Sequence, residues 1–276
     1  MPNDRTYPAG VPCWIDTDQP DVDAARNFYA GLFGWTFADA VPPEVPGTYL
    51  IASLDGADVA AIGPADDAAE ASWSTYIAVD DADVVAVSVR EAGGSLDIEP
   101  ADAGPGGRLA GCVDPRGAHF RLWQPRGRRG AQVVNAPGSW NFSDLHSTDP
   151  DAAQSFYAPL FGWEYDDVGF GTMIRRPGYG DHLSATADPG IRDRQDGISA
   201  PPGFADAIGW LVPLRAGADY WHVTFTVADR DDSVAVAEKL GATVLSSEDT
   251  DWTKSALIRD PQGAELTLSQ FTPPEG

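Results

Sequence analysis

The sequence predicts an α+β fold in which one unit is written twice, each unit holding two strand–helix–strand–strand–strand modules. The block Phe28-Tyr-Ala-Gly-Leu-Phe-Gly-Trp35 returns as Phe156-Tyr-Ala-Pro-Leu-Phe-Gly-Trp163, identical at seven of eight positions and 128 residues later (156 − 28). The block Asp114-Pro-Arg-Gly-Ala118 returns as Asp260-Pro-Gln-Gly-Ala264, 146 residues later (260 − 114). Two such matches indicate an internal duplication, and a repeat of this length decides the fold of the whole chain.

Each copy opens with a strand that is followed by an amphipathic helix. The predicted strands are Val11–Thr17 and Asn141–Ser147. Asp21 and Asp149 then stand where a helix needs an N-cap. Apolar residues recur every three to four positions after each cap. We expect the helices to end near Gly31 and Pro159, which are poor helix formers.

The remaining elements of each copy are separated by turn residues. Strands are predicted after the two helices at Thr48–Leu54, Val59–Ile62, Gly171–Arg176 and His182–Thr186. The second module of each copy has its first strand and its helix at Thr75–Val79 and Ala82–Glu91, and at His222–Val227 and Asp231–Leu240. Both copies end in a hairpin closed by the Asp-Pro-x-Gly turn, because Pro and Gly favour tight turns.

The second copy carries 18 more residues than the first between the two repeated blocks (146 − 128). They fall within the polar, Gly- and Pro-rich stretch 187–208. A long loop in a compact domain usually has a function or is mobile. The sequence leaves two interpretations open, a solvated excursion and a lid over a pocket.

A chain of 276 residues is expected to form two domains. We assign residues 1–125 to the first and 138–276, with the long loop 187–208, to the second; residues 126–137 connect them. Cys13 and Cys112 lie in strand-like segments and are interpreted as buried free thiols, with a disulfide as the lesser alternative.

Composition excludes several classes of partner. The net charge of −24 disfavours nucleic acid, whose phosphates an acidic surface repels. No apolar run approaches the ~18 residues of a membrane helix, and the first residues lack a secretion signal. We therefore expect a cytoplasmic protein, a monomer or homodimer, with a small molecule as its partner.

Four modules with Phe-Tyr near the end of the first helix and a Leu-Phe-Gly-Trp exit resemble the vicinal oxygen chelate superfamily, which includes glyoxalase I, extradiol dioxygenases and bleomycin-resistance proteins. The resemblance covers Tyr7–Thr272, and the chain is similar to the two-domain members of the superfamily that are common in actinobacteria. It implies tandem glyoxalase/bleomycin-resistance-like domains, with four βαβββ modules forming two curved mixed sheets, each around a cleft. The superfamily hosts lyases, oxygenases, epimerases and binding proteins, so the fold alone does not determine function.

The resemblance also places the family's metal ligands, which come from the first and last strands of the modules. The corresponding residues here are Trp14, Ser74, Phe142, His222, Arg121 and Thr267. Only His222 is a competent ligand, so we expect no cofactor. The alternative is a divalent metal on the rearranged set His182, His222 and Glu265.

Strand alternation predicts which side chains of the second copy share its cleft. The expected convergent set is Asp144, His182, His222 and Glu265, with Thr267 on the same face as Glu265. Asp144 and His222 are the candidate catalytic acid and base, and His182, Glu265 and Thr267 are candidate ligand-binding residues. A structurally satisfied histidine is the alternative for His222, and His146 is predicted to lie at the surface.

The cleft of the first copy has a different lining. Its candidate ligand-binding residues are Trp14, Asp16, Tyr76, Arg121 and Trp123. Aromatic walls with a few polar groups suit a planar organic ligand, although Trp14 and Trp123 can equally be ordinary core residues. A buried Arg121 needs a partner, for which Asp16 or a ligand anion is the candidate.

Three functions fit these residues. In the first, the protein lacks the family's metal site and binds a small aromatic or polyketide-like metabolite, with or without transforming it. The second is sequestration of such a compound without chemistry, as in bleomycin resistance. The third is a metal-dependent lyase or dioxygenase/hydroxylase with rearranged ligands. The sequence contains neither a phosphate-binding glycine loop nor a nucleophile elbow.

Overall fold

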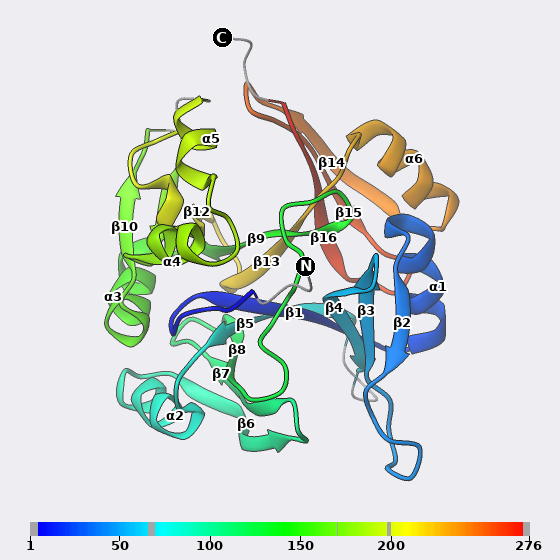
Figure 1. The fold of residues 1–276 in the computed structure, drawn as a ribbon, viewed down its shortest axis with the longest axis horizontal. Helices are drawn as coiled ribbons and strands as arrows, with labels where there is room; N and C mark the ends of the chain where they lie inside the picture. The colour runs from blue at the N-terminus through cyan, green and yellow to red at the C-terminus, as the bar shows by residue number, and fades with distance from the viewer. Residues whose placement is uncertain (1–4, 66–69, 170, 198–199, 273–276) are drawn as a thin grey trace.

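The computed structural model describes residues 5–65, 70–169, 171–197 and 200–272, and in this part of the chain two eight-stranded mixed sheets are formed (Figure 1). The first module consists of β1 (Pro12–Gln19), α1 (Val22–Phe33), β2 (Thr36–Asp39), β3 (Leu50–Leu54) and β4 (Ala57–Pro64). The second consists of β5 (Ser72–Ala78), α2 (Ala82–Glu91), β6 (Ser95–Ala103), β7 (Gly107–Val113) and β8 (His119–Pro125). Their sheet has the order β2-β3-β4-β1-β5-β8-β7-β6.

The second sheet repeats this arrangement. Its third module consists of β9 (Ser139–Ser147), α3 (Pro150–Phe161), β10 (Glu164–Asp167), β11 (Thr172–Arg175) and β12 (Ala207–Pro213). The fourth consists of β13 (Tyr220–Thr226), α6 (Arg230–Lys239), β14 (Thr243–Asp249), β15 (Thr253–Arg259) and β16 (Glu265–Phe271). The order β10-β11-β12-β9-β13-β16-β15-β14 is equivalent strand for strand, so the predicted α+β fold of four βαβββ modules is confirmed.

The helices after β1 and β9 begin as predicted but end later. Asp21 accepts a hydrogen bond from the Ala24 N–H, and Asp149 accepts one from Ala152. Both helices continue two residues past the predicted stops, Gly31 and Pro159, so that prediction was wrong. The reason lies in the caps that follow. Both C-caps are glycines in the left-handed region that only glycine adopts without strain, Gly34 (φ 73°) and Gly162 (φ 66°).

One predicted strand was also wrong. Residues 182–186 lie in and after the helix α4 (Tyr179–Ala185), and the partner of β11 is instead β12. The segment between β11 and β12 also contains α5 (Ile191–Gly197) and the 3₁₀ turn η1 (Phe204–Asp206). The extra residues of the second copy therefore form short helices.

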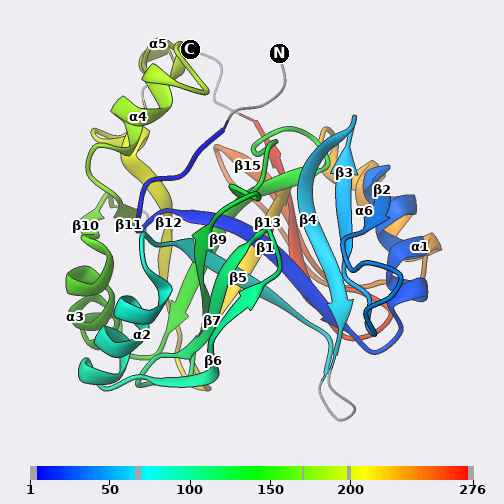
Figure 2. The same cartoon turned by 60° about the horizontal axis from the view of Figure 1, so that its bottom comes forward.

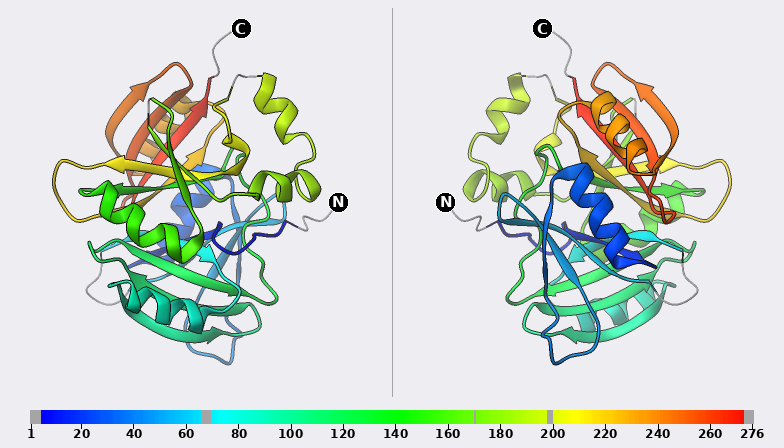
Figure 3. Two further views of the ribbon diagram at one scale, coloured as in Figure 1. Left: turned by 90° about the vertical axis from the view of Figure 1, so that its left-hand side faces the viewer. Right: turned by 90° about the vertical axis from the view of Figure 1, so that its right-hand side faces the viewer.

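The two sheets pack back to back through the central strands, and their cores are shared. One core combines the first module with the fourth, and the other combines the second module with the third. Accordingly α1 lies beside α6, and α2 lies beside α3 (Figures 2 and 3). At the centre, the buried Thr75 hydroxyl donates to Ser143 Oγ at 2.7 Å. The other face of each sheet points away from this contact.

The repeated motifs of the sequence bind each other across the two halves. The Tyr29 hydroxyl donates to Asp260 Oδ2 at 2.8 Å, and the Tyr157 hydroxyl donates to Asp114 Oδ2 at 3.1 Å. Burial and the adjacent carboxylate raise the pKa of both tyrosines well above the ordinary value, so both remain donors. Oδ1 of each aspartate accepts backbone N–H groups of its own turn.

The tryptophans that end the repeated octapeptide make the same exchange. Trp35 Nε1 donates to the carbonyl of Gly138 at 2.7 Å, and Trp163 Nε1 donates to the carbonyl of Gly10 at 2.6 Å. The two glycines are themselves 128 residues apart (138 − 10). Each copy of the octapeptide is therefore anchored at the other half of the molecule.

Cys13 and Cys112 are buried free thiols, as predicted. Within the described ranges, the helices are too short or too polar to cross a bilayer.

The two cross-half tyrosines are predicted to contribute unequally to stability. Tyr157→Phe removes a donor from Asp114 and an acceptor from Trp221, whose Nε1 lies 3.1 Å from the Tyr157 hydroxyl. Tyr29→Phe leaves Asp260 with its second donor, the Gln19 amide at 2.8 Å. We expect losses in the free energy of unfolding of about 2–4 kcal/mol for Tyr157→Phe and about 1–2 kcal/mol for Tyr29→Phe, by urea denaturation. Equal losses would contradict this assignment.

Candidate ligand-binding site

The concave face of the second sheet carries a cluster of titratable groups. Alternation along β9 brings Phe142, Asp144 and His146 to this face, and the antiparallel register with β13 sets Asp144 opposite His222 and His146 opposite Tyr220. The predicted pair Asp144 and His222 therefore occupies neighbouring positions on the two central strands.

His222 is almost fully enclosed. The residue is only 9% exposed, and its Nε2 is 2.8 Å from Thr267 Oγ1 on β16. The ring of His146 lies 5.6 Å from that of His222 and stacks on Tyr220 at 4.7 Å. The prediction that His146 lies at the surface was wrong, because its strand position has the same parity as Phe142 and Asp144.

Burial shifts the pKa values of this cluster toward the neutral forms. Burial raises the pKa of Asp144 to about 7, against the effect of the Trp210 N–H, which donates to Oδ1 at 3.0 Å. Burial and the neighbouring His146 lower the pKa of His222 to about 4, and burial lowers that of His146 to about 4. At neutral pH a carboxyl group near its midpoint thus faces neutral imidazole, an arrangement that can donate and accept protons.

The other residues of the predicted convergent set are engaged elsewhere. His182, on α4, has Nε2 3.0 Å from the carbonyl oxygen of Thr6 and so donates to it. Glu265 forms an ion pair with Arg259 at 2.6 Å. The predicted convergence of four groups was wrong for His182, because residue 182 belongs to a helix and not to a strand.

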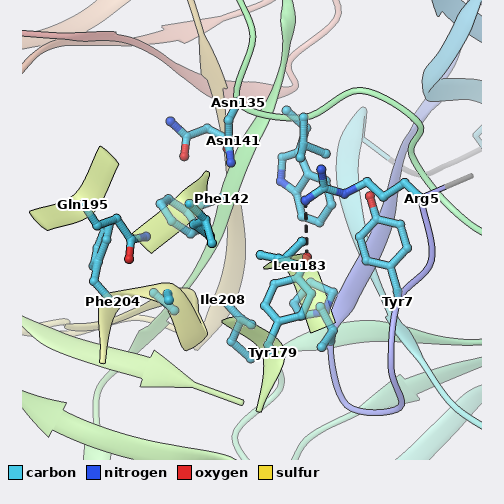
Figure 4. Close-up of a pocket in the computed structure, with 17 residues that line it drawn as sticks. Arg5, Tyr7, Asn135, Asn141, Phe142, Tyr179, Leu183, Gln195, Phe204 and Ile208 are labelled. Carbon is cyan, nitrogen blue, oxygen red and sulfur yellow. Dashed lines mark hydrogen bonds between the residues drawn. The ribbon is translucent and has the colours of Figure 1, made fainter. Parts of the chain in front are cut away.

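A cavity of about 110 Å³ lies between the sheet and the helical insertion that joins β11 to β12 (α4, α5 and η1) (Figure 4). Phe142 lines it, whereas Asp144, His146 and His222 do not. Phe142 and Ile208 form its floor on β9 and β12. The insertion contributes Tyr179, Leu183, Ile191, Gln195 and Phe204. The remaining wall comes from the N-terminal segment (Arg5, Tyr7), the connector (Val134, Asn135) and the start of β9 (Trp140, Asn141). The lining is aromatic with a few polar amides and one guanidinium.

Contacts from the N-terminal segment hold the insertion over the cavity. Arg5 Nη2 donates to the Tyr179 hydroxyl at 3.4 Å, the contact drawn as a dashed line in Figure 4. Thr6 meets His182 through its hydroxyl, 3.1 Å from Nε2. Of the two interpretations of the extra residues, the lid fits these contacts, because α4 and α5 cover the cavity.

The concave face of the first sheet brings together the other predicted residues. Tyr76 and Tyr49 both donate to Asp16 Oδ2, at 2.5 and 2.8 Å, and Trp14 Nε1 donates to the Tyr49 hydroxyl at 3.2 Å. Trp123 packs edge-on against Tyr76. Sequence reasoning missed Tyr49, although it lies within the predicted strand Thr48–Leu54; in the structure it directly precedes β3.

Arg121 pairs differently from the prediction. Its Nη2 lies 3.3 Å from Asp18 Oδ2, and not in hydrogen-bond contact with Asp16. Asp16 is nonetheless close enough to raise the pKa of Arg121, as are Tyr76 and Asp18, against the lowering caused by burial. His119 points to the neighbouring hairpin, where Nδ1 lies 2.9 Å from Asp97 Oδ2.

Comparisons with known proteins agree with this architecture. The Glyoxalase-like domain family matches residues 142–269, and the Glyoxalase/Bleomycin resistance protein/Dioxygenase superfamily matches residues 19–122. CFP32 of Mycobacterium tuberculosis, provisionally named a glyoxylase, is 32% identical over 99% of both chains. The chain belongs to this superfamily. The anthracycline biosynthesis protein DnrV of Streptomyces peucetius is 33% identical over 96% of this chain and 94% of that one.

Solved structures share the fold at low identity. The Mn(II)-bound glyoxalase from Novosphingobium aromaticivorans is 19% identical, with a TM-score of 0.60 over 95% of this chain and 82% of that one. The 2,3-dioxygenase LapB from Pseudomonas sp. KL28 is 11% identical, with a TM-score of 0.61 over 98% and 96% of the two chains.

The residues of this superfamily member do not fit the metal site of such relatives. The equivalent positions hold Trp14, Ser74 and Arg121 in the first sheet and Phe142, His222 and Thr267 in the second. In the described part of the chain, His, Cys, Asp and Glu side chains nowhere gather in threes that could hold an ion. Thr267, at the carboxylate position, is the hydrogen-bond partner of His222.

The buried carboxyl of Asp144 is predicted to make stability depend on pH in a defined direction. Its folded pKa of about 7 lies above the unfolded value near 4, so the folded state binds more protons between these pH values and stability falls as pH rises through them. Asp144→Asn removes this dependence. Relative to Asp144→Asn, the wild type should lose on the order of 2–3 kcal/mol between pH 4.5 and 8.

Urea denaturation across this pH range measures the difference between the two proteins. The lowered pKa values of His146 and His222 destabilise both proteins equally below pH 6.5, so their effect cancels. The exposed Asp251→Asn is the matched control. A difference between Asp144→Asn and wild type that does not vary with pH would contradict the assignment.

Proposed function

We propose that the chain binds a small aromatic metabolite in the cavity of the second sheet, beneath α4 and α5, and that Asp144 and His222 transfer protons to and from it. The observation that carries the proposal is the cavity itself. Its aromatic walls offer stacking surfaces, while Asn135, Asn141 and Gln195 offer donors and acceptors that orient a ligand.

The size of the cavity sets the size of the group that enters it. Its volume of about 110 Å³ is below the roughly 150 Å³ of an engineered apolar cavity that takes up benzene. Entry of a substituted ring therefore requires α4 and α5 to move outward, and a larger polycyclic compound requires a larger movement. Relatives named for anthracycline biosynthesis support a polyketide-like ligand of this kind.

Asp144, the acid of the proposed pair, lies on the same face of β9 as Phe142. Phe142 lines the cavity, and Asp144 is two residues further along on the same side of the strand. The partly protonated carboxyl and the neutral His222 ring supply one proton donor and one acceptor without a cofactor. Thr267 fixes the His222 ring through the hydrogen bond to Nε2.

Filling the cavity should abolish binding. We expect catechol, 1-naphthol or alizarin to raise the melting temperature of the wild type, because a ligand that binds only the folded state stabilises it by mass action. Ala207→Leu places a larger side chain in the cavity and should remove the part of the shift that comes from this site, so that the shift falls well below the wild-type value. Ala185→Leu, the same change at an exposed position of α4, should keep it. Shifts of equal size in both variants would refute the site.

The second candidate function is sequestration without chemistry, which the same aromatic lining favours. The effect of replacing His222 distinguishes it from proton transfer. The compound that binds is incubated with wild type and with His222→Ala, and products are followed by mass spectrometry. Conversion by the wild type that falls at least a hundredfold in His222→Ala, with binding retained, supports proton transfer. Tight binding with no conversion by the wild type supports sequestration.

A further inference from the structure

The concave face of the first sheet contains two buried polar atoms that the proposed function does not use. Among the residues that the structure describes, Asp16 Oδ1 and Arg121 Nη1 have no hydrogen-bond partner. Asp16 is only 3% exposed, so bulk solvent gives the free oxygen little compensation. Leaving such atoms unpaired is costly, and each needs an explanation.

The neighbours of Asp16 orient the free oxygen. Oδ2 is held by the hydroxyls of Tyr49 and Tyr76, and Tyr49 is in turn fixed by the indole N–H of Trp14. The carboxyl group therefore cannot turn to satisfy Oδ1 without breaking two hydrogen bonds. Arg121 is likewise held through Nη2 by Asp18.

The two free atoms are complementary to one chemical group. Arg121 Nη1 is a donor and Asp16 Oδ1 is an acceptor, so a hydroxyl can accept from the first and donate to the second. An anion is disfavoured, because Asp16, Asp18 and Asp97 all act electrostatically on the single guanidinium. The fitting group is neutral.

The surroundings indicate what carries this hydroxyl. Trp14, Tyr49, Tyr76 and Trp123 enclose the polar pair, and Trp123 meets Tyr76 edge to face with ring centroids 6.2 Å apart. Edges and faces of aromatic rings favour another ring. The sheets pack back to back, so this face is separate from the cavity under α4.

We propose that the first sheet contains a second binding site, for a neutral phenolic ring whose hydroxyl bridges Arg121 Nη1 and Asp16 Oδ1. This site is independent of the one in the second sheet, and each half of the duplicated molecule then has its own ligand. Burial raises the pKa of Asp16 to about 6, which leaves it ionised and accepting at neutral pH.

The test compares two probes that differ only in the hydroxyl, 4-fluorophenol and 4-fluoroanisole, by ¹⁹F NMR titration. It uses the full chain carrying Ala207→Leu, so that the cavity of the second sheet is filled. We expect 4-fluorophenol to bind about ten- to hundredfold more tightly than 4-fluoroanisole, the effect of a hydrogen bond to a charged group. In Asp16→Asn the amide oxygen stays with the hydroxyl donors Tyr49 and Tyr76, so the NH₂ group takes the place of Oδ1 and cannot accept the phenol proton. Asp16→Asn and Arg121→Met should each abolish this preference.

Several results would overturn the proposal. They are equal affinity for the two probes, a preference that survives Asp16→Asn or Arg121→Met, and binding that disappears in the Ala207→Leu protein. Loss of binding in the Ala207→Leu protein would refute the site in the first sheet and not the one in the second sheet. Phenol binding that Ala207→Leu does not change would refute the site in the second sheet and not the one in the first sheet. Should both first-sheet variants unfold, a crystal of the wild type soaked in 4-bromophenol decides through the bromine position. A lone water between the two atoms at saturating phenol would refute the site.

Discussion

The hydroxyls of Tyr29 and Tyr157 each reach into the other half of the molecule, where they bind the carboxylates of Asp260 and Asp114. Each carboxylate also holds the backbone of its own turn, so one buried group connects a helix, a turn and the opposite sheet. Because a buried carboxylate is stable only when it is fully hydrogen-bonded, these pairs fix how the two sheets pack. That packing in turn directs the concave faces away from each other.

The two concave faces have the same backbone and different chemistry. The second sheet has His146 and His222 beside Asp144, and burial holds these groups near their neutral forms. The first sheet has Asp16 held by Tyr49 and Tyr76. The insertion explains a further difference, since α4 and α5 enclose a cavity over the second sheet. In the superfamily, the scaffold is thus constant while the side chains on its inner strands decide the chemistry.

The two sheets also differ from the family pattern at the positions expected to bind a metal. The positions that the family resemblance assigns to metal ligands hold aromatic, hydroxyl and guanidinium side chains here, with His222 as the exception. His222 is instead fixed by Thr267, a residue that can orient an imidazole but is a poor ligand for a divalent ion.

The duplication, the order of elements, the N-caps Asp21 and Asp149 and the neighbouring positions of Asp144 and His222 follow from the sequence, because repeats, caps and strand parity are local signals. The sequence could not show that Tyr29 binds Asp260 and not the turn of its own half, since that choice depends on how the sheets dock. It also misplaced His182 and did not identify Tyr49, because both fall in predicted strands but lie outside strands in the structure, so the parity of those predicted strands does not apply to them. The unpartnered atoms of Asp16 and Arg121 are likewise visible only in the tertiary structure, because hydrogen-bond satisfaction depends on every neighbour in space.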